Sequence, residues 1–252
     1  GNVVNVGDMS EDTPGSDRIV EVLLDDEPGP VYLQAWGGTN TIARALWKIQ
    51  HHHPDQIEKV SNKAIIYIIL DQDKTFRENI QPTWPKLQVL GSFRQFACIA
   101  YRWERIIPGP QKSFFEKAWM EQHILNKHGR LCAIYEARDG AFRSEGDSPS
   151  FMHQIDVGLR SLEHPGWGGW GGRYALYTPR SEIWFLEPVT RPIWTNVPDE
   201  VLGKDGEWHT SNHATIWRWR EAYQNDFAAR MDWAKDSSTA LFSYGFSEIA
   251  LY

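Results

Sequence analysis

The chain has 252 residues, of which 41% are hydrophobic and 23% charged, and its formal net charge is −7. A chain of this length and composition can bury the core of one domain or slightly more, which excludes a disordered protein. The acidic balance argues against nucleic acid and anionic membranes as partners, because a phosphate-binding surface needs an excess of basic residues. No apolar run approaches the roughly twenty residues that span a bilayer.

The first part of the chain alternates between predicted helices and strands. We expect a helix over residues 16–26 with Ser16 as its N-cap, and a strand over residues 31–36. Gly37-Gly38 then turn the chain, and a second helix opens at Thr39-Asn40 with apolar residues at helical spacing. This order of strand, glycine turn and helix is typical of an α/β fold.

A second strand is predicted over residues 64–70, where a continuous apolar run indicates a strand that is covered on both faces of a parallel sheet. A third strand is expected at residues 87–90. An amphipathic helix is predicted over 112–127, and a fifth apolar run follows at 131–135.

The last part of the chain is less periodic. Residues 175–210 are rich in Pro, Trp and Gly and predict a long loop, whereas residues 212–233 predict a helix. We therefore expect one α/β domain over residues 1–233 with an open, mostly parallel sheet flanked by helices, and a tail over 234–252. Ligands of such a sheet bind at the edge formed by the carboxyl ends of the strands.

Three polar side chains fall at that predicted edge. Asp71 and Asp73 follow the second strand, where paired carboxylates either form a solvated turn or hold a metal or sugar hydroxyls. Asn40 follows the glycine turn and either caps the helix or faces a ligand. The spacing of this turn is not GxGxxG, so it does not indicate a nucleotide-phosphate site.

A doubled Trp-Gly-Gly at residues 167–172 is the most unusual motif of the chain. Glycine permits backbone conformations that are closed to other residues, while the indoles of Trp167 and Trp170 stand beside it. This combination predicts one wall of a pocket for a sugar or another flat ligand. Glu145 and Asp147 precede the motif; Asp147 either caps a helix that runs to residue 159 or belongs to the same pocket.

The predicted last helix contains Asn225 and Asp226 among aromatic positions that are most simply core. A carboxylate buried there needs a partner, which is either a cation or a basic side chain such as Arg218 or Arg230. A salt bridge is the simpler interpretation.

Five stretches resemble the nucleoside-hydrolase-like domain of proteins often labelled cellulose-binding: VYLQAWGGTNTIARALWK, EGDSPSF, HPGWGGWGGRY, TRPIWTN and SNHATIWRWREAYQNDFAARMDW. The resemblance extends from about Gly7 to Trp233. The stretch WGGTNTIARAL is similar to the Gly-Leu-Thr-Asn turn of true nucleoside hydrolases, and NDFAARMDW resembles their late His-Asp segment.

This resemblance implies an open α/β fold that hydrolyses a glycosidic bond with a calcium-bound water. It places Asp226 on the family's calcium-binding aspartate. Glu145, Asp147 and Asn225 would hold the hydroxyls of a carbohydrate or glycoside, and Trp167 or Trp170 would stack on its ring. The resemblance also implies a secreted protein.

Two features depart from the family pattern. The opening strand with its cluster of aspartates is not found, since the acidic stretch at residues 7–12 matches a later segment; we therefore expect a partial domain whose exposed sheet edge favours self-association. Asn225 stands in place of the hydrolase histidine and cannot act as a general acid. Two functions stay open: a glycosidase of nucleoside-hydrolase type, and a non-catalytic carbohydrate-binding protein that uses Trp167, Trp170 and Trp194.

Overall fold

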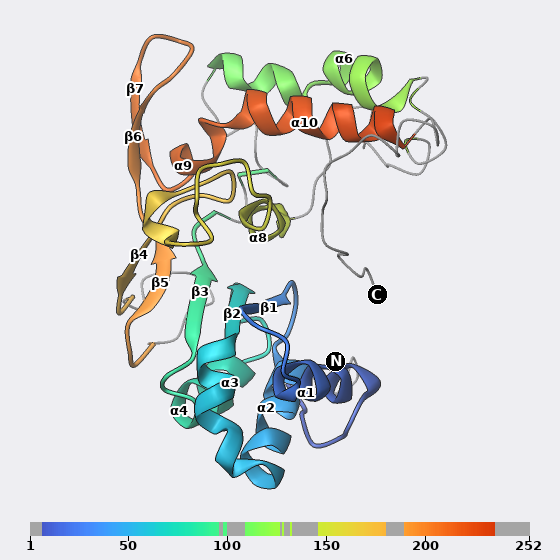
Figure 1. Ribbon diagram of the computed structural model, residues 1–252. Helices are drawn as coiled ribbons and strands as arrows, with labels where there is room; N and C mark the ends of the chain where they lie inside the picture. Colours follow the sequence, from blue (N-terminus) through green and yellow to red (C-terminus); the bar gives the residue numbers. More distant parts are fainter. Residues whose placement is uncertain are drawn as a thin grey trace.

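The fold is built on a five-stranded sheet with the strand order β1-β2-β3-β5-β4 (Figure 1). The four strands β1, β2, β3 and β5 are parallel, and β4 is antiparallel to β5. Their bounds are Val31–Ala35 (β1), Ala64–Ile69 (β2), Gln88–Ser92 (β3), Tyr174–Tyr177 (β4) and Ile193–Asn196 (β5). The computed structural model describes residues 7–95, 98–99, 109–126, 128, 132, 146–179 and 189–234. It confirms the predicted open, mostly parallel α/β sheet.

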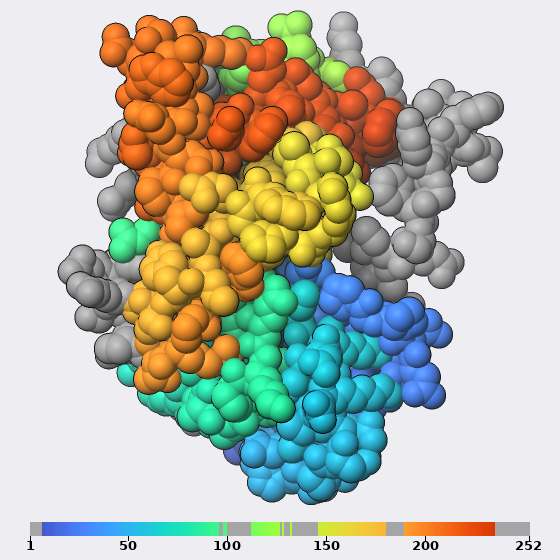
Figure 2. Space-filling view, turned by 60° about the vertical axis from the view of Figure 1, so that its left-hand side comes forward, coloured from blue at the N-terminus to red at the C-terminus, as the bar shows by residue number. Residues whose placement is uncertain are grey.

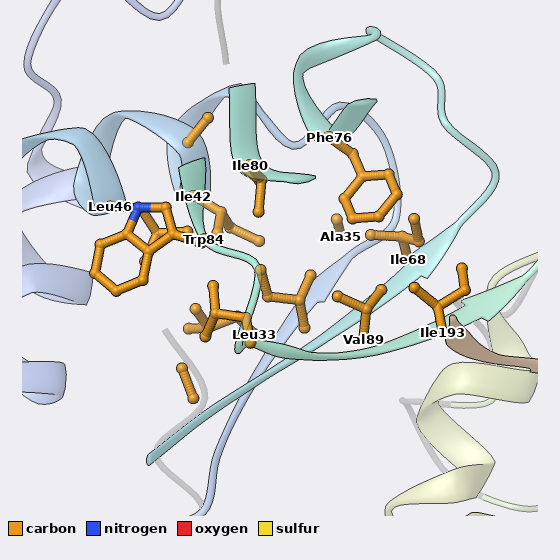
Figure 3. Packing of buried hydrophobic residues seen from close by; sticks show 14 of the residues in the cluster. Leu33, Ala35, Ile42, Leu46, Ile68, Phe76, Ile80, Trp84, Val89 and Ile193 are labelled. Atoms are coloured by element: carbon orange, nitrogen blue, oxygen red, sulfur yellow. The ribbon is translucent and has the colours of Figure 1, made fainter. Parts of the chain in front are cut away.

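One face of the sheet is covered by the helices of the first third of the chain. These are α1 (Pro14–Leu24), α2 (Asn40–His52), α3 (Ile57–Lys63), the π-helical turn Phe76–Ile80 and α4 (Gln81–Thr83), with a 3₁₀ turn at Pro54–Gln56 before α3. Side chains of the sheet such as Leu33, Ile68 and Val89 point into one apolar core with Ile42 and Leu46 of α2 (Figure 3). Burial of this apolar surface is what holds the helices on the sheet.

Strand β2 lies between β1 and β3, and all six of its residues are buried. Its second face carries Tyr67, which packs with Tyr174 and with His153 of α8 (Ser148–His153). His153 is fully buried, and within the described residues neither ring nitrogen has a hydrogen-bond partner. Burial therefore lowers the pKa of His153 to about 4, so the ring packs in its neutral form.

A third layer with its own apolar core lies beyond the carboxyl ends of the strands (Figure 1). It contains the 3₁₀ helix η3 (Gly109–Phe115), α6 (Lys117–Met120), the π-helical turn η4 (Glu121–Leu125), α9 (Ala214–Trp217) and α10 (Arg220–Trp233). A hairpin of β6 (Asp199–Leu202) and β7 (Trp208–Ser211) projects beside this layer. In the space-filling view, residues 146–179 lie between this layer and the first third of the chain (Figure 2).

Several predicted boundaries are wrong. The first helix begins at Pro14, and its N-cap is Thr13, whose hydroxyl accepts a hydrogen bond from the Ser16 amide at 3.1 Å. The helix after Asp147 ends at His153, not at residue 159.

Longer predicted segments also differ from the structure. The predicted loop over 175–210 contains most of β4, all of β5 and β6, and the start of β7. The sequence pattern does not reveal these strands because strands of four residues are too short to show a period. The predicted helix over 112–127 is split into η3, α6 and η4, and the one over 212–233 into α9 and α10. The apolar run at 131–135 lies outside the described residues, except for Cys132.

The glycines of the Trp-Gly-Gly repeat allow its loop to pack closely against neighbouring backbone and side chains. A Cβ on Gly171 would lie 2.7 Å from the His153 amide nitrogen and would also overlap the Pro149 carbonyl oxygen, so only glycine lets this loop pass against α8. Gly172 has a φ of +103° and lies against the side-chain amide of Gln95. The repeat thereby holds α8 against β2.

Among the described residues no helix is both long enough and apolar enough to cross a bilayer.

This packing predicts a large difference between two glycines. Gly171→Ala should lower the free energy of unfolding by at least about 2 kcal/mol, because the added methyl overlaps backbone atoms that cannot move independently. Gly37→Ala is the matched control, since a Cβ there meets nothing within 4 Å in the described part of the chain, and its effect should stay within about 0.5 kcal/mol. Urea unfolding followed by circular dichroism measures both. Equal stabilities of the two variants would contradict the packing role of Gly171.

Candidate functional site

The carboxyl edge of β1 and β2 is organised around the buried carboxylate of Asp73. Its Oδ2 accepts a hydrogen bond from the Asn40 amide at 2.9 Å, and its Oδ1 accepts hydrogen bonds from the hydroxyls of Thr39 at 3.2 Å and Thr75 at 2.7 Å. Asp73 therefore does the work of an N-cap for α2, since Thr39 at the cap position makes no such side-chain bond. A Cβ on Gly38 would overlap the same carboxylate, which explains this glycine.

Asn40 is 6% exposed, and its side chain is engaged within the protein. Its Nδ2 donates to the Asp8 carbonyl at 2.9 Å, and its Oδ1 accepts from the Thr41 amide at 3.0 Å. It lines a pocket of about 230 Å³ at the start of α2. The other lining residues are Asp8, Met9, Glu11, Thr13, Thr41 and Arg44.

Asp71 differs from Asp73 although only one residue separates them. It is 6% exposed, its Oδ2 lies 3.5 Å from Nη1 of Arg77, and its Oδ1 has no hydrogen-bond partner within the described part of the chain. Burial raises the pKa of Asp71 to about 6; the nearby Asp73 and Glu78 carboxylates also raise it, whereas the Arg77 guanidinium opposes the shift. This carboxyl group therefore changes protonation close to neutral pH.

The backbone around Asp71 is strained. Leu70 has a φ of +62° and Lys74 a φ of +66°, in the left-handed region that residues with a branched or long side chain rarely adopt. Each such residue costs on the order of 1–3 kcal/mol, and strain of this kind clusters at functional sites. The turn after β2 is therefore the strongest candidate for a reactive position at this edge.

A second candidate surface surrounds Trp167, which is 55% exposed. His164 stacks on its ring with centroids 5.4 Å apart, and the guanidinium of Arg160 lies 4.9 Å from the same ring. His164 also meets the half-buried ring of Trp194 on β5 edge to face at 5.1 Å. We call Arg160, His164, Trp167 and Trp194 the aromatic face. The sequence does not mark Arg160 and His164, which lie seven and three residues before Trp167. No period could reveal them, because residues 160–167 form turns and a short 3₁₀ helix.

Trp170, the second tryptophan of the repeat, has a different environment. It is 9% exposed, belongs to the apolar core of the third layer, and packs against Tyr223 with ring centroids 6.4 Å apart. The structure therefore does not bring both tryptophans of the repeat to one surface.

Asp226 on α10 forms an ion pair with Arg230 at 2.6 Å, as the simpler interpretation of the sequence predicts. The described residues contain no group of three His, Cys, Asp or Glu side chains that could hold a metal ion. Asn225 is exposed on the same helix.

The two remaining predicted residues lie before α8. Asp147 is at the N-cap position of α8, where its side chain makes no capping hydrogen bond. Glu145 lies outside the described residues.

Residues 1–174 match the family model described as "Cellulose-binding Sde182, nucleoside hydrolase-like domain". The chain belongs to this family. The family model does not cover residues 175–233, although the resemblance seen in the sequence extends over that segment as well. A search of curated proteins found no match.

A solved structure supports the same assignment over most of the chain. It is a nucleoside hydrolase-related protein from Saccharophagus degradans that is associated with carbohydrate metabolism, with 28% sequence identity and a TM-score of 0.65. The similarity covers 94% of this chain and 51% of the other, so the chain spans about half the length of that protein.

The environment of Asp71 predicts a pH-dependent gain in stability for Asp71→Asn. Because the folded-state pKa lies near 6 and the ordinary pKa of an aspartate is 3.8, the folded protein holds an unfavourable buried charge above pH 6, and this penalty disappears as the pH falls towards 4. The asparagine variant should therefore be more stable than the unchanged protein at pH 8, by up to about 3 kcal/mol. The advantage should shrink at pH 4.5.

Urea unfolding at the two pH values measures this difference. Asp73→Asn is the matched control, and it should be destabilising at both pH values because it weakens the cap of α2. An Asp71→Asn variant that is less stable than the unchanged protein at pH 8 would contradict the buried-charge interpretation.

Proposed function

We propose that this chain binds carbohydrate through its aromatic face. The observation that supports this proposal best is the exposed indole of Trp167, on which the His164 ring stacks and over which the guanidinium of Arg160 lies. A half-exposed tryptophan leaves a large apolar ring in water. Such a ring is a typical platform for the apolar face of a sugar ring.

Polar groups around the indole suit the hydroxyls of a sugar. Arg160 offers N–H donors and is oriented by Glu163, whose Oε1 accepts from the Arg160 Nε at 2.7 Å. The carboxylate of Glu163 is exposed and provides acceptors. A ring platform with donors and acceptors at its border is the combination that carbohydrate recognition needs.

The comparisons favour the same ligand class. The family description contains the term cellulose-binding, and the Saccharophagus protein is associated with carbohydrate metabolism. We therefore propose a β-linked glucan as the ligand class to test first.

Glycoside hydrolysis is a second proposed function, and Asp71 is the observation that favours it. A carboxyl group with a pKa near 6 at the carboxyl edge of a parallel sheet is protonated at mildly acidic pH, where it can donate its proton to the leaving oxygen while water adds to the anomeric carbon. Because Oδ1 of Asp71 is buried, this role requires that the substrate or a water molecule reaches it. The calcium ion that the family resemblance implies stays a prediction, and no step of the proposal uses it.

Secretion and self-association through a sheet edge also stay predictions. Strands β1 and β4 are the two edges of the sheet as far as it is described.

Removal of the Trp167 ring should weaken the binding of cellohexaose. Trp167→Ala is expected to raise the dissociation constant about tenfold, since a stacked aromatic ring contributes on the order of 1 kcal/mol or more. Isothermal titration calorimetry measures the change. Trp208→Ala on the β6–β7 hairpin is the matched control, because Trp208 is 64% exposed and lies outside the aromatic face. Unchanged affinity of the Trp167 variant would sink the proposed binding surface.

Hydrolysis has a separate test. If Asp71 acts as a proton donor, release of reducing sugar from cellohexaose should fall as the pH rises through about 6. The release should disappear in Asp71→Asn, while calorimetric affinity for cellohexaose is retained. Binding without release at any pH would leave the binding function alone.

A further inference from the structure

Trp36 is a second exposed tryptophan, and its orientation is fixed by a chain of hydrogen bonds. It follows β1 directly and is 49% exposed. Its Nε1 donates to Oε1 of Gln34 at 3.0 Å, and Nε2 of Gln34 donates to the Ser150 carbonyl of α8 at 3.4 Å. Gln34 and Trp36 share one face of the strand because side chains alternate along it. The indole is therefore held at the junction of β1 and α8.

Phe151 is the residue next to Ser150, whose carbonyl accepts the hydrogen bond from Gln34. It lies on α8 and is 51% exposed. Its neighbours Ser150 and Met152 are buried, so the helix turns this one ring outwards. Two large aromatic side chains thus lie in water where packing does not require them.

The backbone beside Trp36 is open. A Cβ on Gly37 would meet no atom of the described residues within 4 Å, and this glycine has no left-handed φ that would explain it. Gly38, in contrast, is explained by its contact with Asp73. Gly37 therefore leaves an open strip of backbone next to the indole, which lets a ligand approach closely.

We propose that Trp36 and Phe151, with the open strip at Gly37, form a second sugar-binding subsite. The inference rests on the proposed carbohydrate-binding function and deepens it. Chemically the subsite offers two flat rings for the apolar faces of pyranose units and the peptide groups of the open strip for their hydroxyls.

The subsite is separate from the aromatic face. Two strands lie between β1, which carries Trp36, and β5, which carries Trp194. At about 4.8 Å per strand, Trp36 and Trp194 are on the order of 14 Å apart across the sheet. A monosaccharide cannot reach both, so the ligand is an oligosaccharide or polysaccharide chain, or two separate chain segments.

A protein partner fits this patch less well. A stable protein interface buries on the order of 1,000 Å² or more around a central apolar cluster. Trp36 and Phe151 provide two rings next to the polar side chain of Gln34, which is a scale that suits a sugar.

The test compares single variants with cellohexaose as the probe. Trp36→Ala should raise the dissociation constant about three- to tenfold in isothermal titration calorimetry, and Trp36→Phe should restore most of the affinity because it keeps a flat ring. Phe151→Ala should give a smaller loss in the same direction. The control Trp208→Ala should leave the affinity unchanged, and far-UV circular dichroism verifies that each variant is folded.

The outcomes separate the two proposals. If Trp167→Ala weakens binding but Trp36→Ala and Phe151→Ala do not, the second subsite is overturned and the proposed function stands. If the unchanged protein does not bind cellohexaose, the proposed function fails and the subsite fails with it. If Trp36→Ala dissociates a dimer in analytical ultracentrifugation without changing sugar affinity, the patch is an interface between two copies of this chain, which also overturns the proposal.

Discussion

The carboxylate of Asp73 is the interaction on which the carboxyl edge of the sheet depends. It joins the turn after β2 to the first amide of α2 and to the hydroxyls of Thr39 and Thr75. Because these bonds are buried, each is worth more than it would be in water, and loss of the carboxylate would leave several donors unsatisfied. Trp36 lies just before the glycine turn that Asp73 connects to α2. Asp71 lies at the start of the turn after β2, which contains Asp73. The Asp73 carboxylate therefore sets the positions of both Trp36 and Asp71.

A second hydrogen-bond network lies on the face of the sheet that packs against α8, and it joins this face to the third layer. The hydroxyls of Tyr67 and Tyr174 are hydrogen-bonded to each other, and Tyr174 also donates to the Gly171 carbonyl at 2.9 Å. The side chain of Gln95 has its Oε1 3.3 Å from the Tyr174 hydroxyl and donates through its Nε2 to the Thr215 hydroxyl at 3.0 Å. The loop that presents Trp167 is therefore anchored at its glycine end to buried side chains, and the exposed indole stands on a rigid support.

The sequence predicts the elements that a local residue pattern marks. It does not predict the elements that are defined by contacts with distant parts of the chain. The apolar run of β2 and the helical spacing in α2 are strong enough to be read directly, and the structure confirms both. The strands within 175–210 are four residues long and are defined by their partners, so no period marks them. Likewise, nothing in Asp71-Gln72-Asp73 tells which carboxylate caps α2, because that depends on which one meets the amide of Asn40.

The distribution of tryptophans and carboxylates separates structural from functional positions by their energetic cost. Trp170 and Asp73 lie where burial and hydrogen bonding favour them, so the fold alone explains both. Asp71 has a buried oxygen that finds no partner among the described residues, and its neighbour Leu70 is strained; both features reduce stability. Trp36 exposes about half of a large apolar side chain. Residues that cost stability without contributing to packing are expected where a protein binds or reacts, and here they flank the same carboxyl edge.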